Sequence, residues 1–296
     1  DQYLPGDRSD LIWDAYHPTS SLPQVTNPSS GFVHSANQTP FNITAASDNP
    51  RQRDVPANGG WQTRMTNRAT RGLELFEDFG EISFDEAWQL KHDNSYSINY
   101  RGIAFLQQVT SLPKTSDRIA EAIDILSNWD RATDKNNRGA ALGVCVLAAE
   151  WQAESGGSSN PDPQPILDDC IEQTLDIGGR LDPRWGDVNR HGRDDTHWPV
   201  AGGPDTLRAI YSRRLDGDDH LTAVAGDGLY YLIRWMPDGD MRALGTHQYG
   251  NDMTNPDSSH YLDQAEDFTN EILHQPLYSD QDRIGRITRR YDVCSD

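Results

Sequence analysis

The middle of the chain shows the spacing of apolar positions that is typical of α-helices. Ser83 followed by Glu86 forms a capping box, which predicts that a helix starts there. The stretch 140–151 is apolar nearly all round and predicts a buried helix. A glycine pair at 178–179 marks a helix end. We therefore expect a weakly helical segment at 64–79 and helices over 83–92, 119–129, 140–151 and 166–178.

The two ends of the chain differ from the middle, because Pro, Asn, Ser, Thr and Gly interrupt short apolar runs. The best candidate for a strand near the start is 31–37, which lies between two prolines. Near the other end, 228–235 and 241–246 flank a tight Pro-Asp-Gly-Asp turn and predict a β-hairpin. Apolar positions over 261–273 predict a last amphipathic helix.

The order of these elements predicts an α+β fold, since strands and helices do not alternate as they do in βαβ units. No internal repeat and no clear linker divides the sequence. We therefore expect one region, 1–296, which comprises a strand and loop segment (1–80), a helical part (81–180) and a part of mixed strands with the final helix (181–296).

Composition and charge exclude several classes of protein. The chain has 296 residues, of which 35% are hydrophobic, and its longest nearly uncharged apolar run is too short to span a bilayer. The formal net charge of -20 argues against a nucleic-acid partner, because phosphates repel an acidic surface. Charge of this size concerns solubility, and we interpret the acidity as a trait of the habitat.

The three cysteines show neither a C-x-x-C pair nor a spacing of metal ligands. We interpret Cys145 and Cys170 as small buried hydrophobic residues. The alternative is a disulfide that joins two adjacent helices in an exported protein. Cys294, close to the C-terminus, is interpreted as incidental.

General catalytic motifs are absent, namely G-x-S-x-G, H-E-x-x-H, the Walker loop and G-x-G-x-x-G. One cluster of potential metal ligands invites attention, but its spacing fits neither a helix face nor a strand face. It consists of Asp187, His191, Asp194, Asp195 and His197. We therefore expect no metal site there.

One segment carries a specific signal. Residues 22–40 read Leu-Pro-Gln-Val-Thr-Asn-Pro-Ser-Ser-Gly-Phe-Val-His-Ser-Ala-Asn-Gln-Thr-Pro. This segment resembles the β-chain of the penicillin acylase family of N-terminal nucleophile (Ntn) hydrolases, in which an Asn-Pro-x-x-Gly-aromatic-aliphatic strand leads to an Asn. Four later segments also resemble β-chain motifs of that family: 184–190, 202–204, 225–227 and 259–264. The motifs are most similar to those of acyl-homoserine-lactone and lipopeptide acylases.

The resemblance implies a fold and a role for Asn37. It implies a partial Ntn αββα sandwich, the C-terminal part of a β-chain, with a helical insert. In the family, an N-terminal Ser attacks an amide carbonyl with its own α-amine as the base. An Asn side chain helps to stabilise the oxyanion that forms, and by motif position that residue is Asn37. The alternative is an Asn that merely forms a turn at the end of a strand.

The family also has an Arg some twenty to thirty residues beyond this Asn, which reaches back into the site. Arg68 and Arg71 both lie in range, and we prefer Arg68. The alternative is that both are surface arginines at the start of a helix, on one face of it. His34 would point away from Asn37 on a strand, so we expect it to serve packing or the surface.

Asp48 matches a calcium-ligating Asp of some members of the family. One carboxylate cannot hold Ca²⁺ alone, so the other ligands would come from sequence that is missing here. We therefore favour a solvated or capping Asp, and we expect no cofactor apart from a possible structural calcium ion.

The nucleophilic Ser of the family has no counterpart in this chain, which begins with Asp1, whereas Ser9, Ser20 and Ser21 are internal and have no free α-amine. We therefore expect the chain to be inactive alone, as a fragment or a processed subunit that works beside an acylase chain carrying the Ser. The implied substrates are N-acyl compounds such as acyl-homoserine lactones, lipopeptides or β-lactams with amide side chains. The resemblance implies a periplasmic or secreted enzyme. The alternative is a non-catalytic binding or structural module on a degenerate acylase scaffold.

Overall fold

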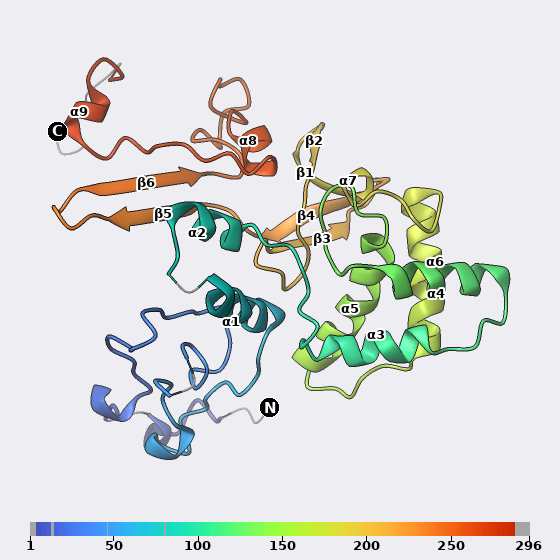
Figure 1. Cartoon of the computed structure of the whole chain (residues 1–296), viewed down its shortest axis with the longest axis horizontal. Coiled ribbons are helices and arrows are strands. Elements are labelled where there is room, and N and C mark those ends of the chain that lie inside the picture. The colour runs from blue at the N-terminus through green and yellow to red at the C-terminus, as the bar shows by residue number, and fades with distance from the viewer. Residues whose placement is uncertain (1–3, 13–14, 46, 80, 288–296) are drawn as a thin grey trace. The chain divides into compact units, whose positions relative to one another are not determined.

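The computed structural model describes residues 4–12, 15–45, 47–79 and 81–287 (Figure 1). Its contacts divide the chain into two compact units, Asp1–Glu77 and Asp78–Asp296. The division falls inside helix α1 (Asn67–Phe79), which explains why neither composition nor a loop signal marks it in the sequence. Cys294 lies outside the described residues.

The first unit consists mainly of turns and loops. Before α1, its described residues form three short 3-10 helices, Ser9–Leu11, Thr19–Ser21 and Gln52–Asp54. The prediction of a strand over 31–37 is wrong, and the described residues of 1–80 contain no strand. Gly31 and Asn37 both have left-handed φ angles, of 79° and 60°, so the segment cannot continue an extended ladder beyond either end.

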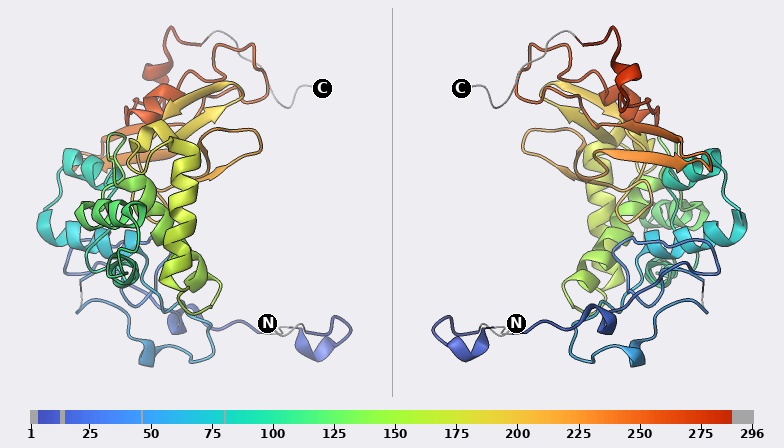
Figure 2. Two further views of the ribbon diagram at one scale, coloured as in Figure 1. Left: turned by 90° about the vertical axis from the view of Figure 1, so that its right-hand side faces the viewer. Right: turned by 90° about the vertical axis from the view of Figure 1, so that its left-hand side faces the viewer.

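The second unit is built around a helical core. Helices α2 (Phe84–Lys91), α4 (Asp117–Asn128), α5 (Ala140–Ser155) and α6 (Pro163–Gly178) confirm the predicted helices. The capping box at Ser83 is formed, and Gly179 ends α6 in the left-handed conformation. Helix α5 contacts α3 (Gly102–Thr110), α4 and α6, so it is surrounded by apolar side chains as its sequence predicts. In Figure 2, α6 is a long helix that passes beside α5.

Most strands of the second unit have no signal in the sequence. Strands β1 (Asn189–Arg193), β2 (Thr196–Pro199), β3 (Ile210–Arg214) and β4 (Leu221–Gly226) form a sheet in the order β2-β1-β4-β3, in which only β1 and β4 are parallel. Strand β1 reads Asn-Arg-His-Gly-Arg, so it lacks the apolar alternation that reveals a strand.

The C-terminal part agrees with the sequence more closely. Strands β5 (Tyr230–Trp235) and β6 (Met241–Thr246) form the predicted antiparallel hairpin. The predicted helix over 261–273 is much shorter than expected, because only α8 (Ala265–Thr269) is helical there. Two further short helices are α7 (Trp185–Val188) and α9 (Asp280–Arg283). The α+β class is confirmed, and none of the helices in the described ranges has the length and apolarity needed to cross a membrane.

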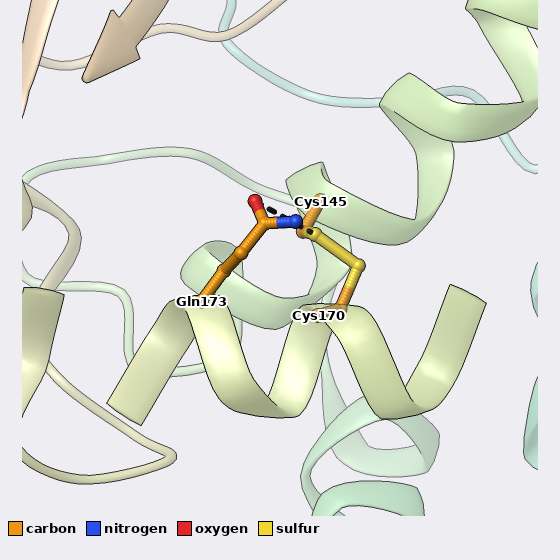
Figure 3. Close-up of a disulfide and its surroundings, with 3 residues drawn as sticks. All are labelled: Cys145, Cys170 and Gln173. Carbon is orange, nitrogen blue, oxygen red and sulfur yellow. Dashed lines mark hydrogen bonds between the residues drawn. A yellow bond between two sulfur atoms is a disulfide. The ribbon is translucent and has the colours of Figure 1, made fainter. Parts of the chain in front are cut away.

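A disulfide joins two neighbouring helices of the core (Figure 3). It links Cys145 on α5 to Cys170 on α6, whose Cα atoms are 5.7 Å apart, and Gln173 lies beside it. Our preferred interpretation of these cysteines as unpaired hydrophobic residues is therefore wrong, since the neighbouring helices α5 and α6 bring the two thiols together. A cross-link between residues 25 positions apart restricts the unfolded chain and stabilises the fold by about 3–4 kcal/mol.

Candidate active site

Asn37 occupies a left-handed turn of the first unit. Its φ of 60° belongs to a conformation that Asn tolerates better than other side chains with a Cβ atom. The residue itself is exposed, whereas its neighbours Ala36, Gln38 and Thr39 are buried. The turn is thus anchored on both sides and presents the carboxamide of Asn37 at the surface.

Side-chain hydrogen bonds hold this turn. The Gln38 carboxamide, only 8% exposed, accepts from the Ala36 N–H and donates to the carbonyl oxygen of His34 at 2.9 Å. The backbone N–H of Thr39 donates to the carbonyl oxygen of Arg64 at 2.9 Å. Because buried amides of this kind are costly to leave unpaired, these bonds fix the backbone on either side of Asn37.

Arg68 reaches the carboxamide of Asn37. It lies in the first turn of α1, and its Nη2 donates to Oδ1 of Asn37 at 3.0 Å. The guanidinium has only donors, so the atom that faces it must be the carboxamide oxygen. The amide nitrogen of Asn37, with its two N–H donors, is consequently the end that remains for another acceptor.

The two arginines that the sequence could not separate have different surroundings. Arg68 meets Asn37, although 31 positions separate the two residues in the sequence. Arg71 forms an ion pair with Glu74 at 3.7 Å on the same helix. The structure therefore brings together the two residues that we preferred, Asn37 and Arg68.

His34 supports the helix that carries Arg68. Its ring Nε2 lies 3.3 Å from the carbonyl oxygen of Arg68, and the ring packs on Phe76 at 5.8 Å. Gly72 makes this approach possible, since a Cβ there would lie 2.5 Å from the His34 ring. Burial lowers the pKa of His34, which favours the neutral ring. The ring thus has a packing environment, although the strand from which we argued its direction does not exist.

Asp48 caps a turn upstream of Asn37. Its Oδ2 accepts from the Ser29 hydroxyl at 2.7 Å and from the Ser30 N–H at 3.2 Å. These hydrogen bonds lower the pKa of Asp48. Calcium needs six or more oxygen ligands, and within the described ranges no three His, Cys, Asp or Glu side chains gather around a common point. A calcium role for Asp48 stays a prediction that requires ligands from elsewhere.

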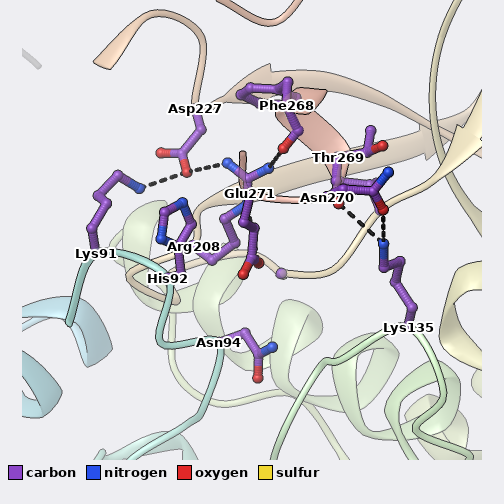
Figure 4. Close-up of polar contacts among 12 residues, drawn as sticks. Lys91, His92, Asn94, Lys135, Arg208, Asp227, Phe268, Thr269, Asn270 and Glu271 are labelled. Atoms are coloured by element: carbon purple, nitrogen blue, oxygen red, sulfur yellow. Dashed lines mark hydrogen bonds and ion pairs between the residues drawn. The ribbon is translucent and has the colours of Figure 1, made fainter. Parts of the chain in front are cut away.

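The later motifs lie in the second unit, where Asp227 of the 225–227 motif holds two cations (Figure 4). Its carboxylate accepts from Lys91 at 2.6 Å and from Arg208 at 2.9 Å. The side chain of Arg208 is fully buried and also donates to the carbonyl oxygen of Phe268 at 2.7 Å. This motif therefore forms a buried ion cluster that joins α2, the sheet and α8.

Two other motifs meet around a buried tryptophan. Trp185 of the 184–190 motif is 1% exposed, and its indole N–H donates to the carbonyl oxygen of Gly202 at 2.9 Å. Gly202 has a φ of 100°, and a Cβ there would lie 2.2 Å from the carbonyl oxygen of Arg208. Trp185 and Gly202 of these motifs thus have packing roles that account for their residue types.

Two buried histidines of the second unit make its stability depend on pH. Burial lowers the pKa of His92 and of His191 to about 4, against 6.5 for a free imidazole. The unfolded chain therefore binds more protons than the folded one between about pH 6.5 and 4. We expect the free energy of unfolding to fall as the pH is lowered through this window, by up to about 1.4 kcal/mol per pH unit for each histidine.

Urea unfolding from pH 7 to 4.5 measures this dependence, and the double variant His92→Gln/His191→Gln provides the comparison. We expect a flatter pH profile for the variant, because its buried amides do not titrate. An unchanged slope would show that other groups cause the pH dependence.

The chain matches a known protein family. A sequence model of the family described as Penicillin amidase matches residues 1–284, which is nearly the whole chain. The chain belongs to the penicillin amidase family. Among solved structures, it is similar to a thermostable penicillin G acylase from Alcaligenes faecalis, with 11% sequence identity and a TM-score of 0.44. The alignment covers 91% of this chain and 58% of that acylase chain.

In this member of the penicillin amidase family, sequence reasoning missed the residues that support the candidate site. Gln38 belongs to the 22–40 motif, but we assigned it no role, and Thr66 belongs to no motif that we recognised, yet both bind the backbone of Ala36, next to Asn37. The only available signal was local, since Thr66 stands where an N-cap residue would precede the helix at 67–79.

Proposed function

We propose that this chain contributes an oxyanion-stabilising side chain to an enzyme that hydrolyses N-acyl amides. The observation that supports the proposal is the hydrogen bond from Arg68 to Asn37 Oδ1, which leaves the N–H donors of the carboxamide for a reacting oxygen. Membership of the penicillin amidase family supports the same reaction class.

In the proposed reaction, a serine Oγ attacks the amide carbon of the substrate, and the free α-amine of that serine accepts its proton. The carbonyl oxygen becomes an oxyanion, which accepts a hydrogen bond from the Asn37 N–H. The amine product leaves with a proton, and water then hydrolyses the acyl ester. The proposal assigns the nucleophilic serine to an acylase chain that works beside this one.

Arg68 has two effects in this proposal. A hydrogen bond from a charged donor withdraws electron density from the carboxamide oxygen, which makes the amide N–H of Asn37 a stronger donor. Its positive charge also favours an oxyanion nearby, in a chain whose net charge of -20 otherwise repels anions. A neutral Asn suits the donor position because it does not titrate.

The proposed substrates are N-acyl compounds, namely acyl-homoserine lactones, lipopeptides or β-lactams with amide side chains. We place the enzyme in the periplasm or outside the cell. The disulfide between Cys145 and Cys170 supports this location, because such bonds persist in oxidising compartments.

The function is tested by the release of amine from a series of N-acyl 4-nitroanilides with short, medium and long acyl chains. The enzyme assayed is the complete one, this chain together with the segment that carries the nucleophile. We expect turnover of at least one substrate. If the complete enzyme binds these amides but releases no amine, the chain is a non-catalytic module on an acylase scaffold.

Arg68→Met tests the proposed site itself. We expect kcat to fall by about 10- to 100-fold, because a hydrogen bond from a charged donor contributes about 1.5–3 kcal/mol. Arg71→Met, on the same helix, is the matched control and should leave kcat within about twofold. A twofold change corresponds to less free energy than one neutral hydrogen bond contributes. Equal losses in the two variants would contradict a specific role for Arg68.

A further inference from the structure

Thr66 joins the two segments that carry the candidate site. Its hydroxyl donates to the carbonyl oxygen of Ala36 at 3.1 Å and accepts from the backbone N–H of Ala69 at 3.1 Å. Ala36 directly precedes Asn37, and Ala69 directly follows Arg68. One hydroxyl group thus connects the turn that bears the carboxamide to the helix that bears the guanidinium.

The contact with Ala36 holds the peptide group that precedes Asn37. The carbonyl oxygen of Ala36 belongs to the peptide group that precedes Asn37, and rotation of this group changes the φ angle of Asn37. A left-handed φ costs roughly 1 kcal/mol or more, even though Asn tolerates it better than most residues. Loss of the partner of this carbonyl would favour a change of this φ, which would move the carboxamide away from Arg68.

The second contact acts on Arg68. Thr66 is the N-cap residue of α1, because its oxygen accepts from the N–H three residues later. This bond fixes the first helical turn, on which Arg68 stands. A displacement of about 1 Å between catalytic groups can reduce the rate by about 10²-fold, so a shared anchor has a large effect on the distance between the two side chains.

We propose that Thr66 is a positioning residue, which holds Asn37 and Arg68 in the geometry required for oxyanion stabilisation. This inference rests on the proposed function. Thr66 makes no contact with substrate in this proposal. Thr66 acts through the Ala36 carbonyl and the first turn of α1.

The test compares Thr66→Val and Thr66→Ser in the complete enzyme, with the N-acyl 4-nitroanilide that is turned over best. Val keeps the shape of Thr and removes the hydroxyl, whereas Ser keeps the hydroxyl. We expect Thr66→Val to lower kcat by about 10- to 100-fold with KM within about threefold, and Thr66→Ser to stay within about threefold of the wild type.

Thr70→Val is the matched control. Thr70 lies on the same helix, and its hydroxyl donates to the carbonyl oxygen of Thr66 at 3.1 Å. Thr66→Val loses the hydroxyl bonds to Ala36 and Ala69, whereas Thr70→Val loses the one to Thr66, and thermal unfolding measures the loss of stability in each. A purely structural role for Thr66 would lower the melting temperature and leave kcat of the folded enzyme unchanged. That result, or an equal fall of kcat in Thr70→Val, would overturn the proposal.

Two further variants keep the test decisive. Asn37→Ala is assayed in parallel. Unchanged turnover in Asn37→Ala refutes the proposed function. A large loss in Asn37→Ala together with normal turnover in Thr66→Val refutes the positioning role alone. Should Thr66→Val fail to fold, Thr66→Ala removes the same hydroxyl without adding a branched side chain, and the same limits apply to its kcat.

Discussion

Replacement of Asn37 by alanine should lower kcat of the complete enzyme by about 10²–10³-fold, because the oxyanion loses a donor that is fixed before the charge develops. The amide N–H of Asn37 is held ready by Arg68, at 3.0 Å from Oδ1, and by a turn anchored on both sides. Steady-state kinetics on an N-acyl 4-nitroanilide measure the effect. KM should change little, since the hydrogen bond becomes strong only as the carbonyl oxygen gains charge.

Asn37→Asp separates the donor from the size of the side chain. The carboxylate has the same shape and can still accept from Arg68, but it has no N–H to offer and adds a negative charge beside the oxyanion. We expect a loss of kcat at least as large as in Asn37→Ala. An effect confined to KM in either variant would contradict the assignment of Asn37.

Replacement of Asp227 by alanine should lower the free energy of unfolding by about 3–5 kcal/mol. The Asp227 carboxylate faces both Lys91 and Arg208, and the side chain of Arg208 is fully buried (Figure 4). The variant leaves two desolvated cations without their shared carboxylate, and the cost of an unpaired buried charge is much larger than that of an exposed one. Urea unfolding at pH 7 measures the change.

Asp124→Ala is the control for this prediction. Asp124 pairs with Lys114 on the surface, where the two side chains are 62% and 48% exposed, so we expect a change of no more than about 1 kcal/mol. Asp227→Asn should fall between the two, because the amide oxygen still accepts one hydrogen bond. A loss below 1 kcal/mol in Asp227→Ala would mean that water replaces the carboxylate in this cluster.

Signals within a few residues predicted α2, α4, α5 and α6, but they did not reveal α3. Ser83 and Glu86 cap α2 as their spacing requires, and Gly179 takes the left-handed conformation that ends α6. The strands of the four-stranded sheet had no comparable signal, since β1 contains Asn, two Arg, His and Gly. The buried polar residues of β1 have partners that no local pattern shows, such as the carbonyl oxygen of Gln248, which lies 2.6 Å from Nε2 of His191.

The sequence by itself determined the class of fold, the position of most of the longer helices, the hairpin and the family, because these depend on local periodicity, caps and motifs. It also indicated Asn37 and left two arginines as its possible partners. Only the tertiary structure decided that Arg68 meets Asn37, that Cys145 bonds Cys170, and that Thr66 anchors the turn at Ala36. Each of these contacts joins residues 25 or more positions apart, and the path of the chain between them depends on packing that no local pattern encodes.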